Sequence, residues 1–472
     1  MGILGRIDTF ITWFDGVVWG LPLIILILVT GIFLTVRLGL LQVRYLGKAL
    51  KFMVKNEEDG HGEVTSFGAL CTALSATIGT GNIVGVATAV CAGGPGALFW
   101  MILAAFFGMA TKFSEGLLAI KYRVVDKDGH SLGGPFYYIE QGMGPKWKWL
   151  AKIFAFFGVC VGLFGIGTFS QVNGIASAIQ NFFDPNKVHT VAIPGIGTYS
   201  WTVVVASLIL AFCVGAVLIG GIKRIASVSQ IVVPFMAVAY VVVVLIILLT
   251  HLGEIPGAFR TIIESAFGLR AAAGGALGAV LMAMQKGIAR GIFSNEAGLG
   301  SAPIAAAAAL TDSPGQQGLI SMLGTFIDTI VICTMTGLSI VIAGTWNIGL
   351  EGVAVTTKAF QTTLPFPEQF SSFILMICLV FFAFTTILGW DYYSEKCLEY
   401  LSNGNQKVVK GYRWLYILAV FIGPYMTVSA VWTIADIFNG LMAIPNLIAL
   451  VALSGVVVSE TKLYLKRIGK AS

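Results

Sequence analysis

Charged residues are scarce in this chain. Asp, Glu, Lys and Arg make up 11% of its 472 residues, hydrophobic residues make up 57%, and the mean hydropathy is +0.88. Average proteins carry about 25% charged residues. Long polar stretches are also missing, so no segment is long enough to form a second, soluble domain. The composition argues against a soluble enzyme and predicts an integral membrane protein.

Grouped metal-binding and catalytic residues are also missing. The seven cysteines have no CxxC or CxxxC spacing, so neither disulfides nor a metal site is expected. The four histidines fall in loops or at span ends, which argues against a histidine proton relay. No paired acids face one surface, so we expect no enzyme and no cofactor. The net charge of +6 comes from basic residues in short loops and does not indicate a nucleic-acid partner.

Apolar runs and turn residues predict an all-α protein with eleven transmembrane helices in a single domain, 1–472. The predicted spans cover 15–37, 65–91, 97–121, 150–181, 199–220, 227–250, 275–310, 318–344, 371–396, 414–435 and 440–462. Of the 29 Lys and Arg residues, 22 belong to one side of this topology and five to the other. Because cytoplasmic loops are enriched in Lys and Arg, we predict an outside N-terminus and a cytoplasmic C-terminus.

The second predicted span is interrupted by Gly79 and Gly81, beside the polar residues Thr77, Thr80 and Asn82. Backbone N–H and C=O groups inside a bilayer need partners, so a broken helix is tolerated only where protein, solute or ion satisfies it. We interpret this break as a binding site. The alternative is a glycine-rich packing notch, which is common in membrane helices.

A second break is predicted at residues 287–291, in the span over 275–310. The two broken helices lie five spans apart and run in opposite directions. A five-plus-five inverted repeat with a discontinuous first helix in each half is typical of secondary transporters, which bind substrate and ion at the breaks. We assign the repeats to 65–250 and 275–462, with 15–37 as an extra N-terminal helix.

The two sides of the first break offer different chemistry. The half-helix that begins near Asn82 presents free N–H groups and a positive dipole end, which suit a carboxylate. Gly79 and Gly81 allow a ligand to approach the backbone closely. The half-helix that ends near Ser75 to Ile78 presents carbonyl oxygens, which suit Na⁺. One break is therefore expected to serve both ligands.

Other polar residues inside spans allow two interpretations each. Gln171 and Asn173 can hold a zwitterion or link neighbouring helices. Thr385 and Thr386 can face a cation or bond to the preceding turn of their own helix. Trp390 can line a pocket for a small side chain or belong to an interfacial aromatic belt.

The span over 275–310 carries an unusual polar load. A substrate ammonium is expected at carbonyls near residues 284–286. Lys286 and Arg290 repel each other on one helix face, and Glu296 is expected to neutralise one of them in an intracellular gate. In the following span, Asp328 either titrates in a proton-coupled transporter or is a structural acid satisfied by Ser and Thr.

Several longer motifs run through the chain in order. They lie at residues 75–83, 93–97, 108–112, 133–135, 291–303 and 385–390, and the first reads SATIGTGNI. These motifs resemble those of the alanine or glycine:cation symporter family. The likeness extends from the first predicted span to the last.

The resemblance implies a sodium-coupled importer of small neutral amino acids, with a LeuT-type fold, in a prokaryotic inner or plasma membrane. It implies alanine, D-alanine or glycine as substrate and Na⁺ as the coupling ion. By similarity, the substrate pocket comprises Thr80, Gly81, Asn82, Gln171, Gly287, Phe293 and Trp390. The sodium site comprises carbonyls of Ser75 and Ile78 with hydroxyls of Thr385 and Thr386.

Three alternatives remain open at this point: a proton-coupled amino acid transporter, a glutamine-preferring sodium symporter, and an amino acid sensor that does not transport. The helix-compatible residues 353–360 are a candidate outer lid or a solvated loop helix. The oligomeric state is not readable, because lipid-facing surfaces and subunit interfaces have similar compositions.

Overall fold

The computed structural model of the chain is a helical bundle with two short β-hairpins. It describes residues 3–54, 60–125, 130–193, 197–269, 275–426 and 428–470. The hairpins pair β1 (Val124–Val125) with β2 (Ser131–Leu132), and β3 (Thr190–Ile193) with β4 (Gly197–Ser200), both antiparallel.

The helices of the first half are α1 (Ile3–Val18), α2 (Leu21–Arg37), α3 (Leu41–Arg44), α4 (Leu46–Val54), α5 (Ser66–Thr77), η1 (Thr80–Asn82), α6 (Val84–Gly93), α7 (Gly96–Lys121), α8 (Pro135–Tyr137), η2 (Tyr138–Gly142), η3 (Pro145–Trp147), α9 (Lys148–Phe164), α10 (Phe169–Phe183), α11 (Trp201–Leu218) and α12 (Gly221–Thr250). Those of the second half are α13 (Ile255–Ala266), α14 (Ala276–Asn295), α15 (Ala302–Ala306), α16 (Pro314–Thr325), η4 (Phe326–Cys333), α17 (Thr334–Ala343), η5 (Thr345–Asn347), α18 (Val353–Thr363), α19 (Glu368–Leu401), α20 (Gln406–Ile422), η6 (Gly423–Tyr425), α21 (Val428–Ala452) and α22 (Ser454–Lys470).

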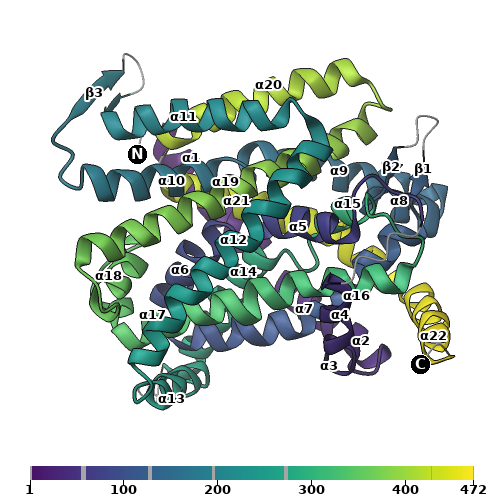
Figure 1. The fold of residues 1–472 in the computed structure, drawn as a ribbon, viewed down its shortest axis with the longest axis horizontal. Helices are drawn as coiled ribbons and strands as arrows, with labels where there is room; N and C mark the ends of the chain where they lie inside the picture. Colours follow the sequence, from purple (N-terminus) through teal and green to yellow (C-terminus); the bar gives the residue numbers. More distant parts are fainter. Residues whose placement is uncertain are drawn as a thin grey trace.

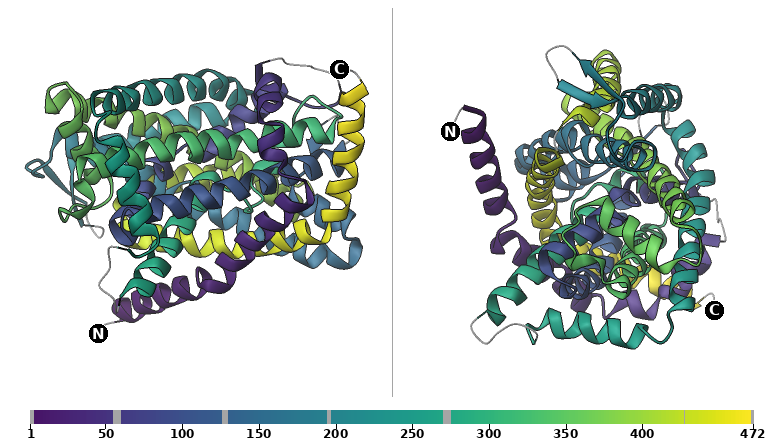
Figure 2. Two further views of the ribbon diagram at one scale, coloured as in Figure 1. Left: turned by 90° about the horizontal axis from the view of Figure 1, so that it is seen from below. Right: turned by 90° about the vertical axis from the view of Figure 1, so that its left-hand side faces the viewer.

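The connections gather at the two ends of the bundle. Figure 1 shows β3, α13 and α18 at one end, called here the α18 end, and β1, α8 and α22 at the other, called the α22 end. This separation agrees with the alternating directions of the predicted spans. Figure 2 shows α22 lying across the direction of the long helices, so it does not continue α21 through the bundle.

Most of the predicted spans are found as long apolar helices. Within the described residues, eight helical segments are long and apolar enough to cross a membrane, and the bent pair α5–α6 raises the number to nine. Two further predicted spans correspond to α14 and to α20, which are not among these segments; α20 has only 17 residues. The chain is therefore a multi-pass membrane protein, and by length and composition eight or nine helical segments of its described residues qualify as membrane spans.

One predicted span contains a short interruption, and one predicted turn is misplaced. The span over 150–181 corresponds to the apolar segment Pro145–Phe183, which is interrupted between α9 and α10, where Gly165 and Gly167 lie. The spans over 414–435 and 440–462 place their turn too late, because α20 ends at Ile422 and α21 already begins at Val428. Pro424 follows the end of α20, where a proline ends a helix at low cost. Hydropathy alone did not reveal this boundary, since the apolar run continues through it.

Two buried helices organise the interior. Helix α7 packs against α14 and α16, and α19 packs against α5, α9, α10 and α12. Glycine allows the closest of these approaches: a Cβ on Gly389 of α19 would lie 2.8 Å from the backbone nitrogen of Ala76. Helix α19 therefore lies directly against the end of α5, where the first break begins.

Candidate functional site

The first predicted break is confirmed. Helix α5 ends at Thr77, Gly79 is extended (φ −143°, ψ −150°), and a 3-10 turn leads into α6. The two half-helices are bent by 60°. The side chain of Asn82 stabilises the turn, because its Oδ1 accepts a hydrogen bond of 2.8 Å from the Gly79 N–H. A helix would have used the carbonyl of Ser75 for that N–H, so the break leaves this carbonyl without its usual donor.

Two consecutive backbone amides at the break face amide oxygens of side chains. Gly79 donates to Asn82, and Thr80 donates to Gln171 Oε1 of α10 at 3.0 Å. The hydroxyl of Thr80 is buried and has no hydrogen-bond partner among the described residues. The structure thus brings Thr80, Gly81, Asn82 and Gln171 together, and the N–H groups of Gly79 and Thr80 both point to side-chain oxygens here.

The glycines of the break are closely surrounded. A Cβ on Gly79 would lie 2.4 Å from Thr386 Oγ1 and 2.9 Å from Gln171 Oε1. A Cβ on Gly81 would lie 3.1 Å from the Cα of Ser294 in α14. Helices α10, α14 and α19 therefore all converge on the break.

The predicted sodium ligands are partly brought together. Thr386 Oγ1 lies 3.2 Å from the carbonyl oxygen of Ile78 and 3.0 Å from that of Phe382. The hydroxyl of Thr385 bonds to Phe381 and Phe382 of its own helix and lies 3.6 Å from Met236 Sδ. Carbonyl and hydroxyl oxygens thus meet where α5 ends against α19, and such hard oxygens suit Na⁺.

The second break is not where the sequence analysis placed it. Helix α14 is continuous through residues 287–291, so the carbonyls near 284–286 lie within a helix. A Cβ on Gly287 would lie 2.2 Å from the carbonyl oxygen of Ala97, which shows that this glycine allows close packing on α7. The helix ends at Asn295, Glu296 is left-handed (φ 57°), and α15 begins at Ala302. The missed pattern is Gly298 and Gly300, both at positive φ.

The polar side chains of α14 also differ from expectation. Arg290 forms a bidentate ion pair with Asp436 of α21, at 2.9 and 2.6 Å, and does not pair with Glu296. Phe293 packs its ring 4.8 Å from that of Trp432. The following residue, Ser294, is the one that contacts Gly81. Phe293 therefore adjoins the break, whereas Gly287 lies against α7 instead.

Glu296 links the second break to α19. Trp390 Nε1 donates to Glu296 Oε1 at 2.6 Å, and the hydroxyl of Ser301 donates to Glu296 Oε2. Trp390 is only 1% exposed, so it does not belong to a lipid-facing aromatic belt. A buried carboxylate with two donors is satisfied, and it fixes the geometry on both sides of the break.

Asp328 connects the two breaks, which the sequence analysis did not foresee. Its carboxylate accepts hydrogen bonds from Asn82 Nδ2 at 2.7 Å, from Ser294 Oγ at 2.9 Å and from Thr329 Oγ1 at 2.6 Å. It lies in η4, a π-helical segment, and such segments are frequent at functional sites. Asp328 therefore has hydrogen-bond donors for its carboxylate, as the structural interpretation predicted, and through Asn82 it contacts the first break directly.

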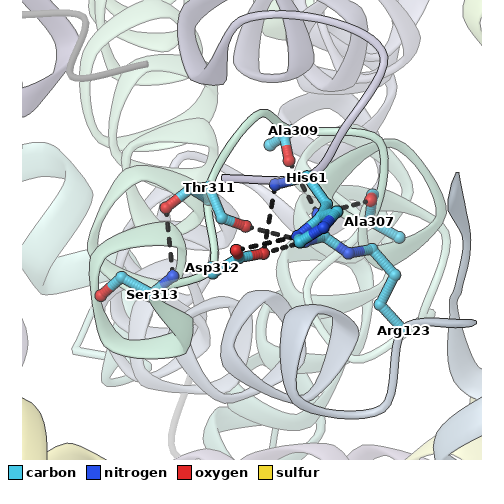
Figure 3. A network of polar contacts seen from close by, with 7 residues as sticks. All are labelled: His61, Arg123, Ala307, Ala309, Thr311, Asp312 and Ser313. Carbon is cyan, nitrogen blue, oxygen red and sulfur yellow. Dashed lines mark hydrogen bonds and ion pairs between the residues drawn. The ribbon is translucent and has the colours of Figure 1, made fainter. Parts of the chain in front are cut away.

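A polar cluster at the α22 end joins the segment before α5 to the segment after α15 (Figure 3), where Val64 and Ala309 also form a β-bridge. Arg123 donates to the carbonyls of Ala309 at 2.8 Å and Thr311 at 3.0 Å, and to Asp312 Oδ1 at 2.7 Å. Asp312 also pairs with His61 at 3.0 Å. We call His61, Arg123 and Asp312 the clasp. Its segments precede α5, follow α7 and follow α15.

We expect Asp312→Asn to loosen the clasp, because Arg123 loses its ionic partner. Burial raises the pKa of Asp312, but the bonds from His61 and the charge of Arg123 outweigh it, so the pKa lies below 3.8. The carboxylate is therefore ionised at neutral pH, and its contribution is lost only as the pH falls through that lowered value.

Hydrogen–deuterium exchange measures this loosening. The amide of Leu310, bonded to Val64 at 2.8 Å, should exchange several times faster in the variant. Glu264→Gln, which removes an exposed ion pair with Arg260 at the α18 end, is the control and should leave this amide unchanged. Unchanged exchange of Leu310 in Asp312→Asn would contradict this role of the clasp.

Comparisons with known proteins agree with this geometry. Residues 5–472 match the model of the sodium:alanine symporter family. The chain is 53% identical to an uncharacterized transporter of Haemophilus influenzae (98% of this chain, 97% of the other) and 49% identical to the sodium/alanine symporter AgcS of Methanococcus maripaludis (95% of each). It is 38% identical to the probable sodium/glutamine symporter GlnT of Bacillus subtilis (96% and 90%).

A solved structure has the same fold. The crystal structure of MhsT in complex with L-phenylalanine matches with a TM-score of 0.56 at 13% identity, over 85% of this chain and 99% of that one. This likeness supports the LeuT-type fold alone. Together with the matches along the whole sequence, it shows a transporter and not an enzyme. The chain belongs to the sodium:alanine symporter family.

Proposed function

We propose that this protein couples the import of a small neutral amino acid, namely alanine, D-alanine or glycine, to the entry of Na⁺. One observation carries the proposal: a single helix break presents paired N–H groups on one side and carbonyl and hydroxyl oxygens on the other. These groups match the carboxylate of an amino acid and a hard cation. The relative AgcS is named a sodium/alanine symporter, which supports this substrate.

In this proposal the amino acid is bound by the N–H groups of Gly79 and Thr80, the hydroxyl of Thr80, the backbone of Gly81 and the side chains of Asn82 and Gln171. The side-chain amides that now accept from Gly79 and Thr80 would turn to the substrate when its carboxylate takes their place. Phe293 and Trp390 border the site. Phe293 precedes Ser294, which contacts Gly81, and Trp390 donates a hydrogen bond to Glu296 at the second break. The role predicted for Gly287 in binding stays a prediction.

The coupling ion is proposed to bind the carbonyls of Ser75 and Ile78 and the hydroxyls of Thr385 and Thr386. Na⁺ there would order the break and thereby raise the affinity for the amino acid, which is linkage between two ligands of one state. No cofactor beyond this ion is proposed.

We place the α22 end in the cytoplasm and the α18 end outside, because most Lys and Arg residues belong to the α22 end. The site then opens alternately to either end. Helix α18 covers the outer half of the broken helix, since Thr356 Oγ1 donates to the carbonyl of Ile83 at 3.3 Å. It is a candidate outer lid.

Uptake of labelled alanine into proteoliposomes tests the proposal. An inward Na⁺ gradient at fixed pH should stimulate uptake above that in an equal gradient of K⁺. Stimulation by a proton gradient without Na⁺ would instead favour the proton-coupled alternative, with Asp328 as its acid. Binding of alanine without counterflow would favour a sensor.

Competition by unlabelled amino acids identifies the substrate. Alanine, D-alanine and glycine should compete with labelled alanine, and glutamine should compete poorly. The relative GlnT is named a probable sodium/glutamine symporter, so stronger competition by glutamine would favour that substrate for this chain too.

A further inference from the structure

Lys112 of α7 is a buried cation without a partner. Its residue is 1% exposed, and its Nζ has no hydrogen bond or ion pair among the residues that the structure describes. An ammonium inside a bilayer is costly unless it is paired, so intramembrane lysines usually have a function. None of the contacts described above uses Lys112.

The ammonium lies at a small cavity beside the end of α5. The cavity is lined by α5 up to Thr77, by Lys112, by Ala302 and Ala306 of α15, and by α16. Gln317 of α16 also lines it, and its Oε1 is buried without a partner in the described part of the chain. Two unpartnered polar groups thus border a cavity that lies between α5 and α15, the inner half-helices of the two breaks.

The acids that face Lys112 come from three elements. Glu115 lies one turn further along α7, Glu296 lies at the second break, and Asp328 lies in η4. The charge of Lys112 acts on all three. The other residues that line the cavity, from α5, α15 and α16, are uncharged. Lys112 therefore interacts electrostatically with three carboxylates, and no hydrogen bond or ion pair in the described part of the chain joins it to any of them.

The end of α5 favours a nearby positive charge both with and without bound Na⁺. The Ser75 carbonyl has lost its helical donor, and the negative end of the helix dipole lies there. Once Na⁺ has left, the carbonyl oxygen of Ser75 would cross the membrane region without a partner, which is unfavourable in a low dielectric. A lysine on a flexible stem can supply the missing positive charge.

We propose that Lys112 is a tethered cation that replaces Na⁺ in the empty carrier. When Na⁺ leaves, the ammonium moves through the cavity to the end of α5 and satisfies the freed oxygens. When Na⁺ binds, it displaces the ammonium towards the three acids. This inference rests on the proposed sodium-coupled transport and adds the step by which the empty carrier returns.

The test separates net uptake from exchange. Net Na⁺-driven uptake needs the return of the empty carrier, whereas exchange of labelled for unlabelled alanine, with saturating Na⁺ on both sides, needs only the loaded carrier. In Lys112→Met, net uptake should fall by at least about tenfold while exchange stays within roughly threefold of the wild type. Lys112→Arg keeps the charge and should retain most net uptake.

A second variant leaves Lys112 in place. Ala73→Leu fills the cavity, so it should block the movement and produce the same split between net uptake and exchange. An equal loss of both activities, or no loss of either, in these variants would overturn the tethered cation. A wild type without Na⁺ stimulation would overturn the proposed coupling as well, so the two failures are distinguishable.

Discussion

Gly79→Ala is expected to remove most alanine uptake without preventing folding. The added Cβ would lie 2.4 Å from Thr386 Oγ1 and 2.9 Å from Gln171 Oε1, where the two ligand sites meet. Overpacking of this kind costs about 1–3 kcal/mol, so we expect a loss of roughly 100-fold in Na⁺-dependent uptake. The backbone at Gly79 is extended, which any residue tolerates, so the effect arises from crowding alone.

Gly85→Ala is the matched control. Gly85 lies in α6, shortly after the break, and a Cβ there would have no neighbour within 4 Å. The variant should transport like the wild type, since alanine also favours a helix more than glycine does. Normal uptake by Gly79→Ala would mean that the break does not form the site.

Asn82→Ala is expected to have an effect of similar size. Its amide caps the Gly79 N–H at 2.8 Å and donates to Asp328 at 2.7 Å. Truncation would leave a buried N–H without an acceptor and a carboxylate with one donor fewer. Each such group costs about 1–3 kcal/mol, so alanine uptake should fall by roughly 100-fold.

The control for this change is Asn173→Ala. Asn173 is also buried, but its amide donates to the carbonyl of Met426 and not to a residue of the break. Uptake by this variant, normalised to the amount of protein in the membrane, should fall by less than about tenfold. Equal losses in the two variants would indicate a general effect on stability and would remove the special role of Asn82.

The first break was predictable because its determinants are local. Gly79 and Gly81 interrupt an apolar run within a few residues, and a broken membrane helix has few physical explanations. The converging partners lie far away in the sequence: Gln171, Ser294 and Thr386 come from three other helices. The residues alone left Gln171 and Thr386 as ligands or as ordinary helix contacts, and the resemblance to a family favoured the role of ligands.

The second break shows where local reasoning fails. Residues 287–291 contain two glycines, but both serve close packing on α7, and their helix continues. The true break uses Gly298 and Gly300 at positive φ. Sequence alone does not distinguish a glycine that packs from a glycine that turns, because the neighbouring helix decides.

The clasp and Asp328 depend on contacts that no local pattern contains. Arg123 and Asp312 are 189 residues apart, and Asp328 and Asn82 are 246 apart. Each residue alone is compatible with a solvated loop or an isolated acid. Their partners became apparent only when the helices were placed side by side.

A single helix break is proposed to bind an amino acid and Na⁺ together. The affinity of the purified protein for labelled alanine, measured in NaCl and in KCl of equal ionic strength, tests this directly. We expect binding to be at least about tenfold tighter in Na⁺. The advantage should be reduced in Thr386→Val, whose hydroxyl meets the carbonyl of Ile78, and kept in Ser394→Ala, whose hydroxyl donates to the carbonyls of Trp390 and Asp391 in its own helix. Equal affinity of the wild type in both salts would contradict the claim.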